Sequence, residues 1–163
     1  MGLVRLISAS ALTPLLLALV VVVFAPTPDA TVHRDSVAGI QSAAADSDGV
    51  KLSLNAEGDL PGMTSVALRR DGNKVTGGEW TLTIFPPDAS PTASEKGKLK
   101  GTVTGGTLGF NDDGAVTRAE SLQLTIQSGT GQYAGVKSGT GTLDLSPHAE
   151  NPSQLVGTLT LNF

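Results

Sequence analysis

Side chains that could do chemistry are few in this chain, and they are scattered along it. The sequence has no cysteine and only two histidines, His33 and His148. It therefore excludes a thiolate nucleophile, thiolate metal sites and disulfide bonds. Neither histidine has a second histidine at metal-binding spacing. A Ser-His-Asp triad would have to use His148, and no Gly-x-Ser-x-Gly elbow accompanies it, so we do not expect a hydrolase.

One segment has the spacing of a calcium loop. Asn111, Asp113 and Glu120 fall at the third, fifth and twelfth places of an EF-hand loop that would begin at Gly109. That loop needs an aspartate at its first place and helices on both sides, whereas here glycine stands first and strands flank the segment. Asn, Asp and Gly are also the residues that tight turns use, so the interpretation we favour is a hairpin turn without a metal.

Carboxylates inside the domain would be the other catalytic candidates. Glu79 alternates with Trp80, and Asp144 alternates with Leu143. Side chains of a strand change sides at every residue, so these two acids should point to solvent, and paired catalytic carboxylates are not expected. Trp80 should be a core residue. Trp80 and Tyr133 are the candidates for contact with a ligand.

From Val50 onward, apolar and polar residues alternate with a period of two, and this pattern predicts that β-strands carry these residues. The chain has 20 glycines and few aromatic residues, and it shows no amphipathic helix after residue 48. Short strands are predicted over 50–56, 64–70, 79–84, from 99, and over 115–118, 121–127, 140–146 and 154–163. Seven or eight such strands suit a barrel or a two-sheet sandwich. Without disulfides, an architecture with few open edges is favoured; we predict an all-β antiparallel barrel of about eight strands, with the two-sheet sandwich as the alternative.

The N-terminal part is predicted to be an export signal followed by a linker. One positive charge precedes an uncharged apolar segment that reaches Ala25, which is the pattern of a secretory signal over residues 1–25. An uncleaved membrane anchor is the alternative, and cleavage after Ala25 or near Ala30 both fit. Residues 26–48, rich in Pro, Ala and Ser, are predicted to be a flexible linker. The β domain is then residues 49–163, and the location is extracytoplasmic.

The net charge and the sequence around two motifs argue against several kinds of partner. The net charge of −4 argues against nucleic acid, because phosphate binding needs clustered Lys and Arg. Gly129 to Ala134 matches a dinucleotide fingerprint, but no helix follows it. The alternating C-terminal strand ends in Phe163, as membrane barrels often do, yet the aromatic girdles of such barrels are missing. We expect no cofactor, and contact with a membrane only through the N-terminal segment if it stays uncleaved.

The stretch from Ile126 to Gly141 contains Gly129-Thr130-Gly131, then Tyr133, Ala134-Gly135 and Gly139-Thr140. It resembles the signature of allene oxide cyclase-like and dirigent-like barrels, in which it joins two strands, although Ser128 stands where glycine is common. The resemblance implies an eight-stranded antiparallel barrel with a small interior. The polar residues that those families use do not align to positions here, so no activity is transferred.

Together these observations predict a secreted or envelope β-barrel module. Its expected role is non-enzymatic, namely the binding of a small apolar ligand or of a surface partner. The alternative is a cyclase or isomerase that acts by the shape of its cavity. An interior filled by Leu, Val, Ile and Trp80 would mean binding by the loops or no binding, and a ligand-sized cavity with an inward-facing acid would favour the enzyme.

Overall fold

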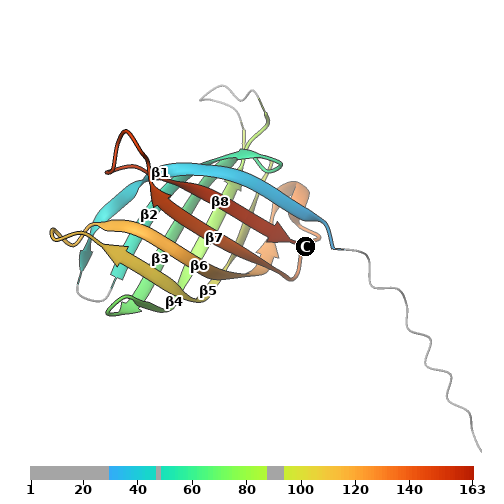
Figure 1. Ribbon diagram of the computed structural model, residues 1–163. Helices are drawn as coiled ribbons and strands as arrows, with labels where there is room; N and C mark the ends of the chain where they lie inside the picture. The colour runs from blue at the N-terminus through green and yellow to red at the C-terminus, as the bar shows by residue number, and fades with distance from the viewer. Residues whose placement is uncertain (1–29, 47–48, 88–93) are drawn as a thin grey trace, which may run out of the picture.

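The computed structural model describes residues 30–46, 49–87 and 94–163. Within them, eight antiparallel strands close into a barrel in chain order, so that β8 returns to pair with β1 (Figure 1). This confirms the predicted all-β barrel. The strands are β1 (Val32–Asp46), β2 (Gly49–Gly58), β3 (Gly62–Asp71), β4 (Lys74–Ile84), β5 (Gly97–Phe110), β6 (Val116–Gly129), β7 (Gly139–Pro147) and β8 (Leu155–Asn162).

Apolar side chains of every strand meet on the barrel axis. In β2, the buried residues alternate with exposed ones, as the period-two pattern predicts. The core is one connected cluster of Leu, Val, Ile, Ala and Trp side chains. Its largest fully buried members are Trp80, Leu52, Leu54, Leu82, Ile84, Leu99, Leu108, Leu122, Leu143, Leu155, Leu159 and Leu161. Burial of these side chains is the main source of stability in a chain without cysteine.

Trp80 is a core residue, as predicted. Its side chain is 2% exposed, and its indole Nε1 donates a 3.1 Å hydrogen bond to the carbonyl oxygen of Thr125. Gly101 pairs with Trp80 on the neighbouring strand, and a Cβ at Gly101 would collide with both the Thr125 carbonyl and the indole nitrogen. The glycine therefore makes room for the single tryptophan and its hydrogen bond.

The prediction of a flexible linker over 26–48 is wrong for residues 32–46, which form β1. This strand pairs with β2 from Asp35 opposite Gly58 onward, and with β8 from Val32 opposite Asn162 to Gly39 opposite Leu155. It closes the barrel, as the blue strand beside the red β8 shows (Figure 1). The β domain therefore begins within the predicted linker and not at residue 49.

The strand was missed because its inward face lacks an apolar pattern. Residues 33, 35, 37 and 39 face the interior, and they are His33, Asp35, Val37 and Gly39. Only Val37 is a large apolar residue, whereas Ile40 faces outward with 57% of its surface exposed. Backbone pairing with two neighbouring strands, rather than side-chain burial, determines this strand.

Two short strands predicted at 115–118 and 121–127 are one strand, β6. The register with β7 shifts between Ala119 and Leu122, and Ser121 has a positive φ of 49° at this bulge. The irregularity interrupts the alternation that the prediction used. The backbone N–H of Ser121 donates a 2.7 Å hydrogen bond to Oδ1 of Asp144 on β7.

One end of the barrel is formed by the starts of the odd-numbered strands and the ends of the even-numbered ones. We call it the Asp35 end. The β2–β3 turn, the β6–β7 connection and the C-terminal residue Phe163 lie there (Figure 1). The predicted signal segment, residues 1–25, lies outside the described residues. No helix in the described ranges has the length and hydropathy to cross a membrane.

Candidate functional site

Asp35 is a carboxylate inside the barrel. It is 1% exposed, and it faces inward from β1 between His33 and Val37. Its Oδ1 accepts a 2.8 Å hydrogen bond from the backbone N–H of Leu60 in the β2–β3 turn. Its Oδ2 is buried and has no hydrogen-bond partner. Buried polar atoms are nearly always paired, so this oxygen marks a candidate site.

The local backbone is arranged around this carboxylate. Gly58 lies opposite Asp35 with a φ of 148°, and a Cβ there would come within 2.9 Å of Oδ1. Asp59 then reaches back, and its Oδ2 accepts a 2.8 Å hydrogen bond from the N–H of Arg34. Leu60, held by Asp35, is 3% exposed and belongs to the core cluster. One oxygen of Asp35 therefore has a structural role, and the other is free.

Protonation of Asp35 is easier than protonation of an exposed aspartate. Burial raises the pKa of this carboxyl above its ordinary value of 3.8. The hydrogen bond from Leu60 lowers the pKa, the negative charge of Asp59 raises it, and the charge of His33 lowers it again. The balance is a raised pKa, as expected of a carboxyl group in a desolvated position.

Three aromatic rings lie at the Asp35 end of the barrel. His33 is the next inward residue toward the start of β1, and its ring stacks on Phe163 with 4.7 Å between centroids. Tyr133 packs edge-on against Phe163 at 6.5 Å. Burial raises the pKa of the Tyr133 hydroxyl, and the charge of Asp35 raises it further. We call His33, Tyr133 and Phe163 the aromatic cluster.

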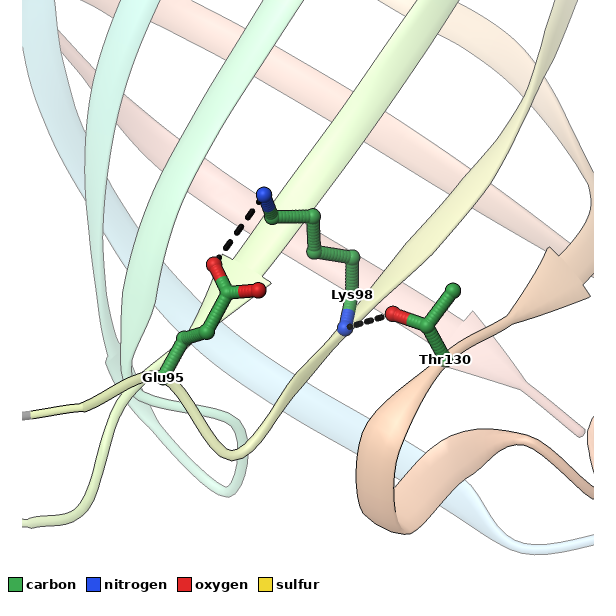
Figure 2. A network of polar contacts seen from close by, with 3 residues as sticks. All are labelled: Glu95, Lys98 and Thr130. Carbon is green, nitrogen blue, oxygen red and sulfur yellow. Dashed lines mark hydrogen bonds and ion pairs between the residues drawn. The ribbon is translucent and has the colours of Figure 1, made fainter.

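Backbone contacts to β5 place Tyr133 in this position. The Gly131–Tyr133 segment is a short 3-10 helix in the β6–β7 connection. The N–H of Lys98 donates a 3.1 Å hydrogen bond to Oγ1 of Thr130, and Nζ of Lys98 forms a 3.0 Å ion pair with Glu95 (Figure 2). The N–H of Gln132 bonds to the carbonyl of Lys96 at 2.9 Å. The segment is thus fixed to the start of β5.

Thr64 is a second buried polar residue at the same end. It lies two residues inside the start of β3 and faces inward with 0% exposure. Its Oγ1 has no hydrogen-bond partner. Odd-numbered strands all start at the Asp35 end, so Thr64 and Asp35 both lie near it, on strands separated by β2. Asp35 and Thr64, the two buried polar or charged residues in the described part of the chain, are therefore at one end of the barrel.

The two predicted ligand contacts have different positions. Tyr133 is partly buried, packs against the core cluster and belongs to the aromatic cluster. Trp80 lies within the core between β3 and β5, opposite Val66 and Gly101. Only Tyr133 is therefore part of the candidate site.

Of the calcium candidates, Asn111 and Asp113 lie in the β5–β6 turn at the opposite end, and Glu120 lies within β6. Oδ1 of Asn111 accepts a 2.8 Å hydrogen bond from the N–H of Ala115. Asp113 is exposed in the turn, and Glu120 forms a 3.3 Å ion pair with Arg118 on β6. Among the described residues, no group of three or more His, Cys, Asp or Glu side chains is arranged to hold a metal ion.

Sequence reasoning placed two acids correctly and missed a third. Glu79 and Asp144 are exposed on the outer wall, as predicted. Asp35 lies in the segment predicted to be a linker, and a linker prediction gives its side chain no inward direction. The only signal was an alternation of polar and small residues over 32–39, with Val37 as its single large inward residue.

A hollow of about 570 Å³ lies on the outer wall over β1, β2 and β8. Its lining includes Ser36, Asn55 and Glu57, which are exposed. None of the buried unpaired polar atoms belongs to this lining. The hollow therefore lacks the buried, unpaired oxygens of the Asp35 end.

Comparison of the chain with protein-family models, with curated proteins and with solved structures finds no match.

Proposed function

We propose that this protein is a secreted or envelope module whose barrel binds a small, largely apolar ligand at the Asp35 end without altering it chemically. The observation that carries the proposal is the pair of buried, unpaired oxygens, on Asp35 and Thr64, at one end of a core that is otherwise apolar. Ligand sites are typically apolar with a few polar groups that orient the ligand. The apolar core beside these two oxygens and the aromatic cluster support this combination.

Side chains fill the rest of the barrel interior, and this supports binding over catalysis by the shape of a cavity. Leu, Val and Ile side chains and Trp80 form one connected core cluster. The aromatic cluster provides apolar contact area and a hydroxyl at the rim of the site. An exported origin follows from the N-terminal sequence pattern alone and stays part of the proposal.

Native mass spectrometry of the protein purified from its own host tests the binding function. We expect a co-purifying small molecule, and we expect the Tyr133→Ala variant to lose it. The control is Phe110→Ala, because Phe110 is the aromatic residue at the opposite end, where Arg70 lies 4.4 Å above its ring. Absence of bound mass, together with no fluorescence change of the neutral apolar probe N-phenyl-1-naphthylamine, would overturn the proposal.

Asp35 favours a second candidate, an isomerase or cyclase. A buried carboxyl group with a raised pKa is suited to transfer protons as a general acid or base. The test is to incubate the recovered ligand with wild-type protein and with Asp35→Asn and to analyse the products by chromatography. Conversion by the wild type alone, with binding kept in both proteins, would establish the enzyme over the binding module.

A further inference from the structure

The buried carboxylate of Asp35 forms no ion pair with the residues that the structure describes. The ion pairs of the described residues are Lys98–Glu95 and Arg118–Glu120, so no Lys, Arg or His nitrogen of that part of the chain is paired with Asp35. The neighbouring charge of Asp59 adds to the negative potential, and the charge of His33 offsets part of it. A buried charge is costly unless it is paired and hydrogen-bonded. Oδ2 is therefore a position at which a bound cation would gain both an opposite charge and a hydrogen bond.

We propose that the ligand is a hydrophobic amine, whose ammonium group donates a hydrogen bond to Oδ2 of Asp35. The inference rests on the proposed function and specifies its ligand class. An ammonium group has three donors and no acceptor, which matches an unpaired carboxylate oxygen. A neutral alcohol would satisfy the hydrogen bond but would leave the carboxylate without an ion-pair partner, so the amine should bind more tightly.

The surroundings of Asp35 suit the rest of such a molecule. The rings of Tyr133 and Phe163 lie on the side of Asp35 that faces the barrel end. Aromatic faces attract cations and also provide apolar contact area. Because Oδ2 is covered in the structure, the ligand reaches it by displacing the side chains that cover it, and its hydrocarbon part then packs against the apolar core and the rings beside it.

Isothermal titration calorimetry with matched probes tests the inference on the full chain. The probes are 2-phenylethylamine and hexylamine, each compared with its alcohol, 2-phenylethanol and hexan-1-ol. At neutral pH we expect each amine to bind wild-type protein at least about tenfold more tightly than its alcohol. In Asp35→Asn, the amine should lose this advantage while alcohol binding stays within about twofold. Glu79→Gln, which removes an exposed outer-wall acid, is the control and should keep the wild-type preference.

The outcomes separate this inference from the proposed function. Equal affinity for amine and alcohol in the wild type would overturn the amine assignment and leave apolar binding intact. If the amines do not bind while N-phenyl-1-naphthylamine still binds, the amine assignment is likewise overturned and apolar binding stays intact. Failure of every probe would count against both. The wild-type comparison needs no variant, so it decides the question even if Asp35→Asn does not fold.

Discussion

Two polar side chains are packed inside this leucine-rich barrel, and each has an oxygen without a hydrogen-bond partner. Asp35 and Thr64 are 1% and 0% exposed. An unpaired buried polar group costs free energy of folding, because its hydrogen bonds to water are lost and not replaced. Residues that are unfavourable for stability often belong to functional sites, which is why these two define the candidate site.

The hydroxyl of Thr64 should destabilise the folded protein. We expect Thr64→Val, which has nearly the same shape, to raise the free energy of unfolding by about 1 kcal/mol. Chemical denaturation measures the change. The control is Thr125→Val, because the hydroxyl of Thr125 is paired with that of Thr102 at 2.8 Å and its loss should be destabilising. A loss of stability in Thr64→Val would mean that the hydroxyl has a structural partner.

Asp35 should make stability depend on pH. Its pKa in the folded protein is above the ordinary 3.8, so the folded state binds a proton more tightly than the unfolded state. The resulting stability is present below pH 3.8, decreases as pH rises toward the raised pKa, and is absent above it. Urea unfolding across this range should show the decrease in wild-type protein relative to Asp35→Asn. Parallel pH profiles of the two proteins would contradict the assignment.

Strands β1 and β6 depend on contacts that cannot be predicted from their own sequences. In β6, the bulge at Ser121 has a positive φ, and the carboxylate of Asp144 bonds to its N–H at 2.7 Å. A bulge bends a strand and leaves a backbone group to be paired by other means. Asp144, predicted only as an exposed acid, therefore has a specific role in holding β6 on β7.

Removal of that carboxylate should weaken the β6–β7 pairing. We expect Asp144→Ala to lower the free energy of unfolding by about 1 kcal/mol, the usual value of one hydrogen bond at a partly exposed site. Thermal or urea denaturation measures it. Glu79→Ala is the matched control, since Glu79 is an exposed strand acid without a described hydrogen bond or ion pair, and it should change stability by less than about 0.5 kcal/mol. Equal effects of the two substitutions would argue against the role of Asp144.

At the scale of the whole molecule, closure of the barrel depends on β1. This strand pairs with β2 on one side and β8 on the other, and without it both would be open edges. Exposed edges of this kind invite pairing between molecules. The same strand carries His33 and Asp35, so the strand pairing that closes the barrel also places these residues in the candidate site.

A chain that begins at residue 49 should therefore not fold as the closed barrel. We expect residues 49–163 to associate or aggregate, whereas residues 30–163 should give the cooperative unfolding of a closed barrel. Size-exclusion chromatography with light scattering and a thermal melt would compare the two. A cooperative melt and an unchanged association state in the shorter chain would show that β1 is dispensable.

The sequence by itself determined the class of fold and most of the core. From Val50 onward, large apolar side chains recur at every second position, and this pattern alone separates the interior of a strand pair from its outer face. It also placed Trp80 inside the barrel and Glu79 and Asp144 outside. The physical reason is that burial of apolar area, a local property of each strand, dominates the choice of face.

The tertiary structure decided where β1 lies and what Asp35 faces. The inward positions of β1 hold mainly polar or small residues, so no local pattern of burial identifies the strand. Its conformation comes from backbone pairing with β8, where Val32 meets Asn162 from the other end of the chain. Pairing between such distant segments depends on the closed barrel as a whole, and only that closure turns an aspartate in a polar segment into a buried carboxylate beside an aromatic cluster.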